Sequence, residues 1–166
     1  MSLTLAAVGA VVAAVLQLTI VPYLGIAGAY PDLLLVVAVI ATFAWSTEAG
    51  MTLAFVGGLM IDLLAPRPIG LTAFTLLVAI GIAALLGRVI QRGRVVAPIV
   101  LIFGLTFVTD ILFLGMFSAL SGKLEVGDPI QLILPGAIYS TALAVVVSPA
   151  AMAIHNRFAD RERVAW

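Results

Sequence analysis

The sequence predicts an all-α polytopic membrane protein, folded as one compact bundle of six transmembrane helices. Hydrophobic residues make up 64% of the 166 residues and charged residues only 10%, and the mean hydropathy is +1.29. A soluble domain is nearer to half apolar and a quarter charged, so lipid must cover much of this surface. Long uncharged stretches separate the charged residues, and about 20 apolar residues cross the roughly 30 Å hydrocarbon core. We expect one transmembrane domain over residues 1–166.

These uncharged stretches predict the helices in chain order. The first helix ends at Pro22, because proline cannot continue a helix without losing a backbone hydrogen bond. The last three helices each coincide with an uncharged stretch, and the fifth is long enough to tilt. The expected helices are at about 3–21, 31–45, 47–64, 71–89, 95–120 and 129–155, and a short cytoplasmic tail follows at 156–166.

The stretch 31–64 is read as two helices, because a single helix would place Glu48 near the middle of the membrane. Pro31 and Asp32 suit the first turn of a helix, and Ser46 suits an N-cap. The first helix of the pair is only about 22 Å long at 1.5 Å per residue. We expect it to thin the bilayer or to lean on its neighbours. A bundle of five helices is the alternative.

Arginines predict the orientation of the chain in the membrane. One group lies between the fourth and fifth helices, and another follows the sixth, so two crossings separate them. The positive-inside rule places both groups in the cytoplasm, together with the amino and carboxyl termini. The groups are Arg88, Arg92 and Arg94, and Arg157, Arg161 and Arg163.

The residue inventory argues against catalytic and cofactor chemistry. The chain has no cysteine for a disulfide or a thiolate metal site, and its single histidine, His155, has no second histidine for a metal site. No histidine lies at a suitable depth to pair with a serine nucleophile. The net charge is zero and no basic face is present. We predict no catalytic residue, metal, cofactor or nucleic-acid partner.

A stripe of small residues in the third helix ends on an acid. Residues four positions apart lie along one side of a helix, and small residues there let another helix backbone approach closely in lipid. We expect Asp62 to clamp a neighbouring helix, a partner protein or Arg67. The alternative is an acid that is merely hydrated at the membrane edge. The stripe consists of Gly50, Ala54, Gly58 and Asp62, with Gly57 beside it.

Asp110 is the deepest charged residue, near the middle of the fifth helix. Thr106 precedes it by one helical turn and can hydrogen-bond to it. No basic residue lies at this depth, so we expect Asp110 to be either neutral or hydrogen-bonded to a group such as Gln17 or Tyr139. We favour an interhelical hydrogen bond over a proton relay, which normally needs several such groups.

An ordered set of residues in the central segment matches a known family pattern. The set comprises Tyr30-Pro31-Asp32 before an apolar run, then Gly50, Phe55, Gly57-Gly58-Leu59, Asp62-Leu63-Leu64 and Ile69-Gly70. Over roughly residues 30–88 the chain resembles the MreD family of rod shape-determining proteins, and the six-helix layout agrees elsewhere. Asp110 falls where the family often has an acid. The turn Ser46-Thr47-Glu48 lacks the basic residues of some relatives, so contact of this turn with anionic lipid is in doubt.

The resemblance implies a non-enzymatic scaffold in the bacterial cytoplasmic membrane that helps to control cell shape and peptidoglycan elongation. Its fold would be similar to that of the substrate-binding subunits of energy-coupling-factor transporters. Its partner would be MreC, a single-span protein, with the peptidoglycan polymerase and transpeptidase of elongation also associated. We expect partner contacts or helix packing at Gly50, Ala54, Gly57, Gly58, Asp62 and Gly70, and buried polar roles for Gln17, Thr106 and Asp110.

Two other functions compete with the scaffold. A vitamin-binding subunit of an energy-coupling-factor transporter would need an outward pocket, for which the candidates are Gln17, Tyr23, Tyr30, Asp32 and Asp62. A proton-coupled carrier would use Asp110. We rank the carrier last, because inverted repeats, which are typical of such transporters, are not evident.

Overall fold

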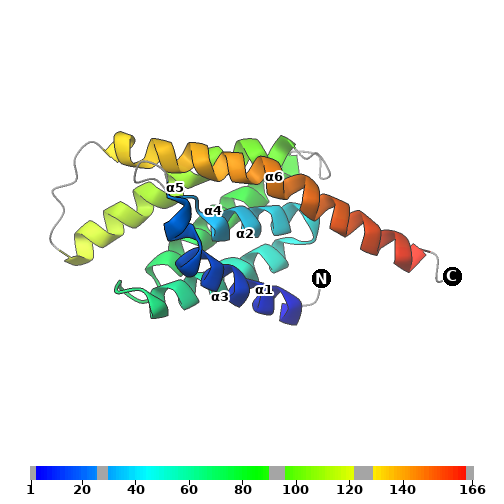
Figure 1. Cartoon of the computed structure of the whole chain (residues 1–166), viewed down its shortest axis with the longest axis horizontal. Helices are drawn as coiled ribbons and strands as arrows, with labels where there is room; N and C mark the ends of the chain where they lie inside the picture. The colour runs from blue at the N-terminus through cyan, green and yellow to red at the C-terminus, as the bar shows by residue number, and fades with distance from the viewer. Residues whose placement is uncertain (1–2, 26–29, 90–95, 122–128, 164–166) are drawn as a thin grey trace.

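The computed structural model describes residues 3–25, 30–89, 96–121 and 129–163, and all regular structure within these ranges is helical. This confirms the prediction of an all-helical protein. A short 3-10 helix, η1 (Val21–Leu24), follows the first of six α-helices (Figure 1). These are α1 (Leu3–Thr19), α2 (Leu33–Ala44), α3 (Thr47–Leu64), α4 (Leu71–Val89), α5 (Val96–Ser121) and α6 (Pro129–Arg163).

The shortest α-helix, α2, lies at the centre of the bundle (Figure 1). It contacts each of the other five α-helices, and ten of its 12 residues are buried. A helix surrounded by protein is apolar on all sides. At about 18 Å, α2 is much shorter than the hydrocarbon core. Because protein rather than lipid covers α2, its length does not have to match the bilayer.

Local capping explains why the stretch 31–64 divides into two helices. The Leu35 N–H donates to Asp32 Oδ1 at 3.0 Å at the start of α2. The Ala49 N–H donates to Ser46 Oγ at 3.2 Å at the start of α3. Each cap satisfies a backbone donor that has no partner within its own helix. The two caps therefore begin the two helices separately.

Four helical segments of the described chain are long and apolar enough to cross a membrane. They are Leu3–Tyr23, Thr47–Leu64, Ile99–Leu120 and Ile133–Ala151, whereas Leu33–Ala44 and Leu71–Gly87 are shorter apolar helices. Large apolar side chains remain exposed on α1, α3, α4, α5 and α6. A contiguous apolar surface of this kind indicates contact with lipid or with other membrane helices.

Three helix ends differ from the predicted ones by two residues or more, and the first is the start of α2, which lies at Leu33 because Asp32 is its N-cap. α1 ends at Thr19 and the chain tightens into η1, because Pro22 lies there. α6 continues to Arg163 instead of ending near residue 155, and its C-terminal part extends beyond the other helices (Figure 1). After Pro149 the segment contains neither proline nor glycine, and alanine, arginine and glutamate favour helix. The expected tail is therefore helical as far as Arg163.

Candidate functional site

The start of α2 is held by side chains from two other helices. Gln17 of α1 donates from Nε2 to the Pro31 carbonyl at 3.3 Å, and its Oε1 accepts from the Leu33 N–H at 2.7 Å. The Asp32 N–H donates to Ser140 Oγ of α6 at 2.9 Å. The first N–H groups of a helix lack partners within it. Gln17 and Ser140 supply such partners and thereby fix the end of the central helix between α1 and α6.

The start of α4 is held in the same way by Asp62 of α3. The Thr72 N–H lies 3.1 Å from Oδ1 and 2.9 Å from Oδ2, and the Ala73 N–H donates to Oδ2 at 3.3 Å. Asp62 is only 2% exposed, and little water can reach its carboxylate. The backbone donors and the positive end of the helix dipole take the place of that water. Gly70 just before α4 has φ = +90°, a conformation that side chains disfavour.

The small-residue stripe of α3 is covered by helices of the same chain. A Cβ on Gly50 would overlap Thr42 Oγ1 of α2, and a Cβ on Gly58 would lie 2.5 Å from the Ala73 Cα of α4. Leu34 of α2 covers Gly57, and Ala54 is 0% exposed. Close approach at these positions sets the packing of α3 against α2 and α4. Their contact with a separate partner stays a prediction.

The hydrogen bonds around α5 differ from the predicted pairings. Thr106 Oγ1 donates to the Ile102 carbonyl at 2.8 Å instead of to Asp110, because a threonine hydroxyl in a helix readily bonds the carbonyl one turn back. Gln17 is engaged at the start of α2. Among the described residues, no hydrogen bond reaches the Asp110 carboxylate. Asp110 instead lines a cavity.

This cavity has a volume of about 480 Å³ and lies where α1 and α3 end and α2 and α4 begin, beside the middle of α5. Apolar walls come from residues such as Leu76 and Phe113. Within the described ranges, no three His, Cys, Asp or Glu side chains gather as metal ligands. The polar lining consists of Gln17, Asp32, Arg67, Thr72, Thr75, Thr109 and Asp110.

The sequence predicts only part of this lining. Gln17, Tyr30 and Asp32 line the cavity, whereas Asp62 is occupied by α4 and Tyr23 is 90% exposed. The threonines of α4 and α5 are not predicted, because an isolated threonine in an apolar helix gives no sequence signal of which neighbours it meets.

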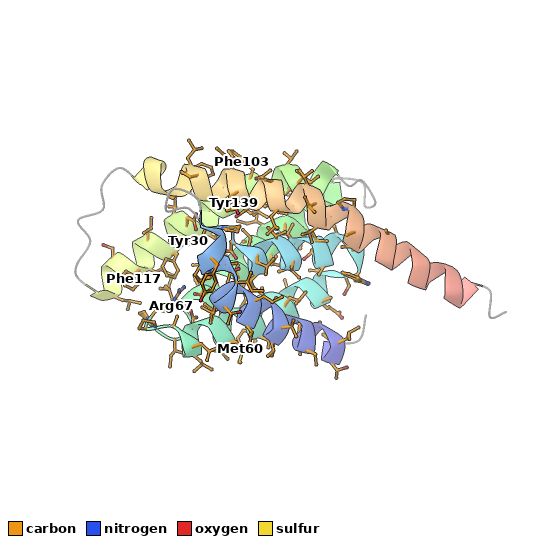
Figure 2. All side chains as sticks on the ribbon, viewed as in Figure 1. Tyr30, Met60, Arg67, Phe103, Phe117 and Tyr139 are labelled. Atoms are coloured by element: carbon orange, nitrogen blue, oxygen red, sulfur yellow. The ribbon has the colours of Figure 1, made fainter. Side chains whose placement is uncertain are left out.

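Arg67, in the turn between α3 and α4, lies at the rim of the cavity. Its Nη1 donates to Thr72 Oγ1 at 3.2 Å, and its guanidinium carbon is 5.3 Å from the centroid of the Phe113 ring, within the range of a cation–π contact. Phe113 in turn stacks on Phe117 at 6.0 Å. Figure 2 shows Tyr30, Arg67 and Phe117 at the same end of the bundle.

A second feature, on the outer face of α5, was not predicted. Gly104 and Gly115 are exposed, and a Cβ added to either would meet no atom within 4 Å. They lie eleven positions apart, about three helical turns, and so share one side of the helix. Val100 and Ile111 on the same side are 67% and 59% exposed. The inner side of α5 faces the bundle instead, with Ile102 and Leu105 buried.

Comparison with known proteins agrees with the motif in the central segment. No curated protein and no solved structure matches the chain, and nothing in these comparisons supports the vitamin-binding alternative. A family model described as rod shape-determining protein MreD matches residues 2–158, nearly the whole chain. The match confirms the resemblance and extends it beyond residues 30–88. This helical, apolar chain therefore belongs to the MreD family of rod shape-determining membrane proteins.

Proposed function

We propose that the chain is a non-enzymatic scaffold of the rod complex, which binds the transmembrane helix of an MreC-like protein in the bacterial cytoplasmic membrane. Membership in a shape-determining family supports this assignment. The peptidoglycan polymerase and transpeptidase of elongation would then associate with the pair, in part through MreC. The arginine distribution supports cytoplasmic amino and carboxyl termini.

We further propose that all six helices belong to the membrane domain, in an arrangement similar to the substrate-binding subunits of energy-coupling-factor transporters. The length of α2 needs an explanation, whereas α4 has 19 residues and is no shorter than α3. Protein surrounds α2 on every side, so a helix shorter than the bilayer is acceptable there.

The observation that carries the docking proposal is the open glycine face of α5, defined by Gly104 and Gly115. Glycine costs a helix about 1 kcal/mol relative to alanine, and no contact within the described chain explains these two glycines. In lipid, small residues stabilise helix pairs by letting the backbones approach. The glycine stripe of α3 is less suitable, because α2 and α4 already cover it.

The test is to fill the open face and to measure partner retention. The double variant Gly104→Leu/Gly115→Leu places two bulky side chains where a partner backbone would lie. We expect co-purification of MreC with this variant to fall at least tenfold, about 1.4 kcal/mol of association free energy. Membrane insertion should stay unchanged and thermal unfolding in detergent should not fall, because a Cβ at either position meets no heavy atom of the described chain within 4 Å and leucine favours helix over glycine.

A matched control is Gly81→Leu on α4, since a Cβ on Gly81 also meets nothing within 4 Å. Full retention of MreC by Gly81→Leu would localise the loss to α5. If the double variant on α5 retains MreC as well as the natural chain does, the α5 face is not the docking surface. If the natural chain itself fails to bind MreC, the scaffold assignment fails.

A further inference from the structure

The cavity contains separated charges of both signs. Asp32 at the start of α2 and Asp110 in α5 line it together with Arg67 at the rim. The two carboxyl groups interact electrostatically with one another, and Asp32 also interacts with Arg67. When both carboxyl groups are ionised, they and the one guanidinium leave a net negative charge. A cationic group of a ligand would offset this charge.

Apart from Arg67, the polar atoms of the cavity offer unused acceptors more than unused donors. The Thr75 hydroxyl donates to the Thr72 carbonyl at 3.0 Å. The Thr109 hydroxyl lies 3.0 and 2.9 Å from the carbonyl oxygens of Leu105 and Thr106, which share its one proton. With their protons committed, both hydroxyls keep lone pairs.

The carboxylate oxygens add to this acceptor capacity. Asp110 receives no hydrogen bond from the described chain, and Asp32 uses Oδ1 for its own helix cap. A primary ammonium, with three N–H donors and no acceptor, complements this inventory. A quaternary ammonium has no N–H and does not.

Arg67 supplies the positive charge in the lining of the cavity. Within the part of the chain that the structure describes, one of its five N–H donors is used, in the bond to Thr72, and the Phe113 ring holds the guanidinium in place. A guanidinium recognises phosphate and carboxylate by paired hydrogen bonds. The volume of about 480 Å³ is in the range of small-molecule sites and much larger than a single water or ion.

We propose that this cavity binds a small zwitterion, with a primary ammonium directed to Asp32 and Asp110 and a phosphate or carboxylate directed to Arg67. Phosphatidylethanolamine presents this chemistry as a lipid headgroup, and free phosphoethanolamine presents it in water. The site lies away from the open face of α5, so the inference goes beyond docking of a protein partner and does not depend on it.

The first experiment uses the full chain in vesicles that contain equal parts of phosphatidylethanolamine, phosphatidylcholine and phosphatidylglycerol. Lipids that remain bound after detergent extraction are counted by native mass spectrometry. We expect phosphatidylethanolamine to be retained at least tenfold over phosphatidylcholine, whose ammonium cannot donate, and over phosphatidylglycerol, which has no ammonium. A parallel thermal-shift titration with free phosphoethanolamine, ethanolamine and inorganic phosphate tests the soluble source.

Variants connect binding to the lining side chains. Asp110→Asn and Arg67→Gln should each lower retention of phosphatidylethanolamine, or the affinity for phosphoethanolamine, at least tenfold. Glu48→Gln, an exposed acid at the start of α3 and outside the lining, should leave both unchanged.

Each outcome decides whether the cavity binds a zwitterion or whether that zwitterion is a lipid headgroup or a soluble molecule. Retention of the lipid alone supports a headgroup site, and a shift with free phosphoethanolamine alone supports a soluble ligand. Equal retention of the three lipids together with no shift by phosphoethanolamine overturns the proposal. If both cavity variants fail to fold, the retention of phosphatidylethanolamine relative to phosphatidylcholine by the natural chain decides the proposal.

Discussion

α3 and α5 both carry glycines along one side, but the two sides meet different surroundings. On α3, Gly50 and Gly58 lie against other helices so closely that a Cβ would overlap Thr42 or approach the backbone of Ala73. On α5, a Cβ added to Gly104 or Gly115 would meet no heavy atom of the described residues within 4 Å. The first glycine face is part of the internal packing and the second is available. Glycine spacing alone does not distinguish the two, and only the neighbours do.

The largest effect is expected for Gly58→Leu on the closed face. The added atoms would displace the backbone at the start of α4, which lies 2.5 to 2.7 Å from the position of a Cβ. Overpacking against backbone should lower the free energy of unfolding by about 3 kcal/mol or more. Thermal unfolding in detergent measures the loss, with Gly104→Leu as the matched substitution on α5. Equal stability of the two variants would remove the distinction between the faces.

A smaller loss is expected for Asp62→Ala, which continues the closed face into the cap of α4. The substitution removes the acceptors of the Thr72 and Ala73 N–H groups. Loss of a helix cap should lower the free energy of unfolding by about 1–2 kcal/mol. Asp62→Asn keeps one acceptor oxygen and should lose less. If Asp62→Ala unfolds like the natural chain, these hydrogen bonds do not stabilise the start of α4.

The smallest effect, and one of opposite sign, is expected for Gly115→Ala on the open face. Alanine favours helix over glycine by about 1 kcal/mol, and its methyl group would meet no heavy atom of the described residues within 4 Å. The isolated protein should therefore unfold at a slightly higher temperature. Gly57→Ala is the comparison on α3, where Leu34 would have to move. A lower unfolding temperature for Gly115→Ala would show that α5 is packed on this side.

Asp62 and Asp110 show how far the hydrogen-bond partners of a single acid can be predicted from the sequence. The sequence predicts that Asp62 clamps a helix, a partner or Arg67, and in the structure its carboxylate accepts hydrogen bonds from the α4 backbone. Asp110 was expected to bond Thr106, Gln17 or Tyr139, yet Thr106 and Gln17 bond backbone groups instead. Backbone acceptors and donors are present at every position and are not visible as motifs.

Composition and charge spacing were sufficient to predict a helical membrane protein and the break between α2 and α3, because lipid length and helix caps are local properties of the chain. The motif from Tyr30 to Gly70 was sufficient for the family. Three features required the folded chain. The other helices pack around α2, neighbouring helices cover the α3 glycines, and Asp32, Arg67 and Asp110 line one cavity. These features depend on contacts between helices distant in sequence, and a periodic pattern does not specify which helix faces which.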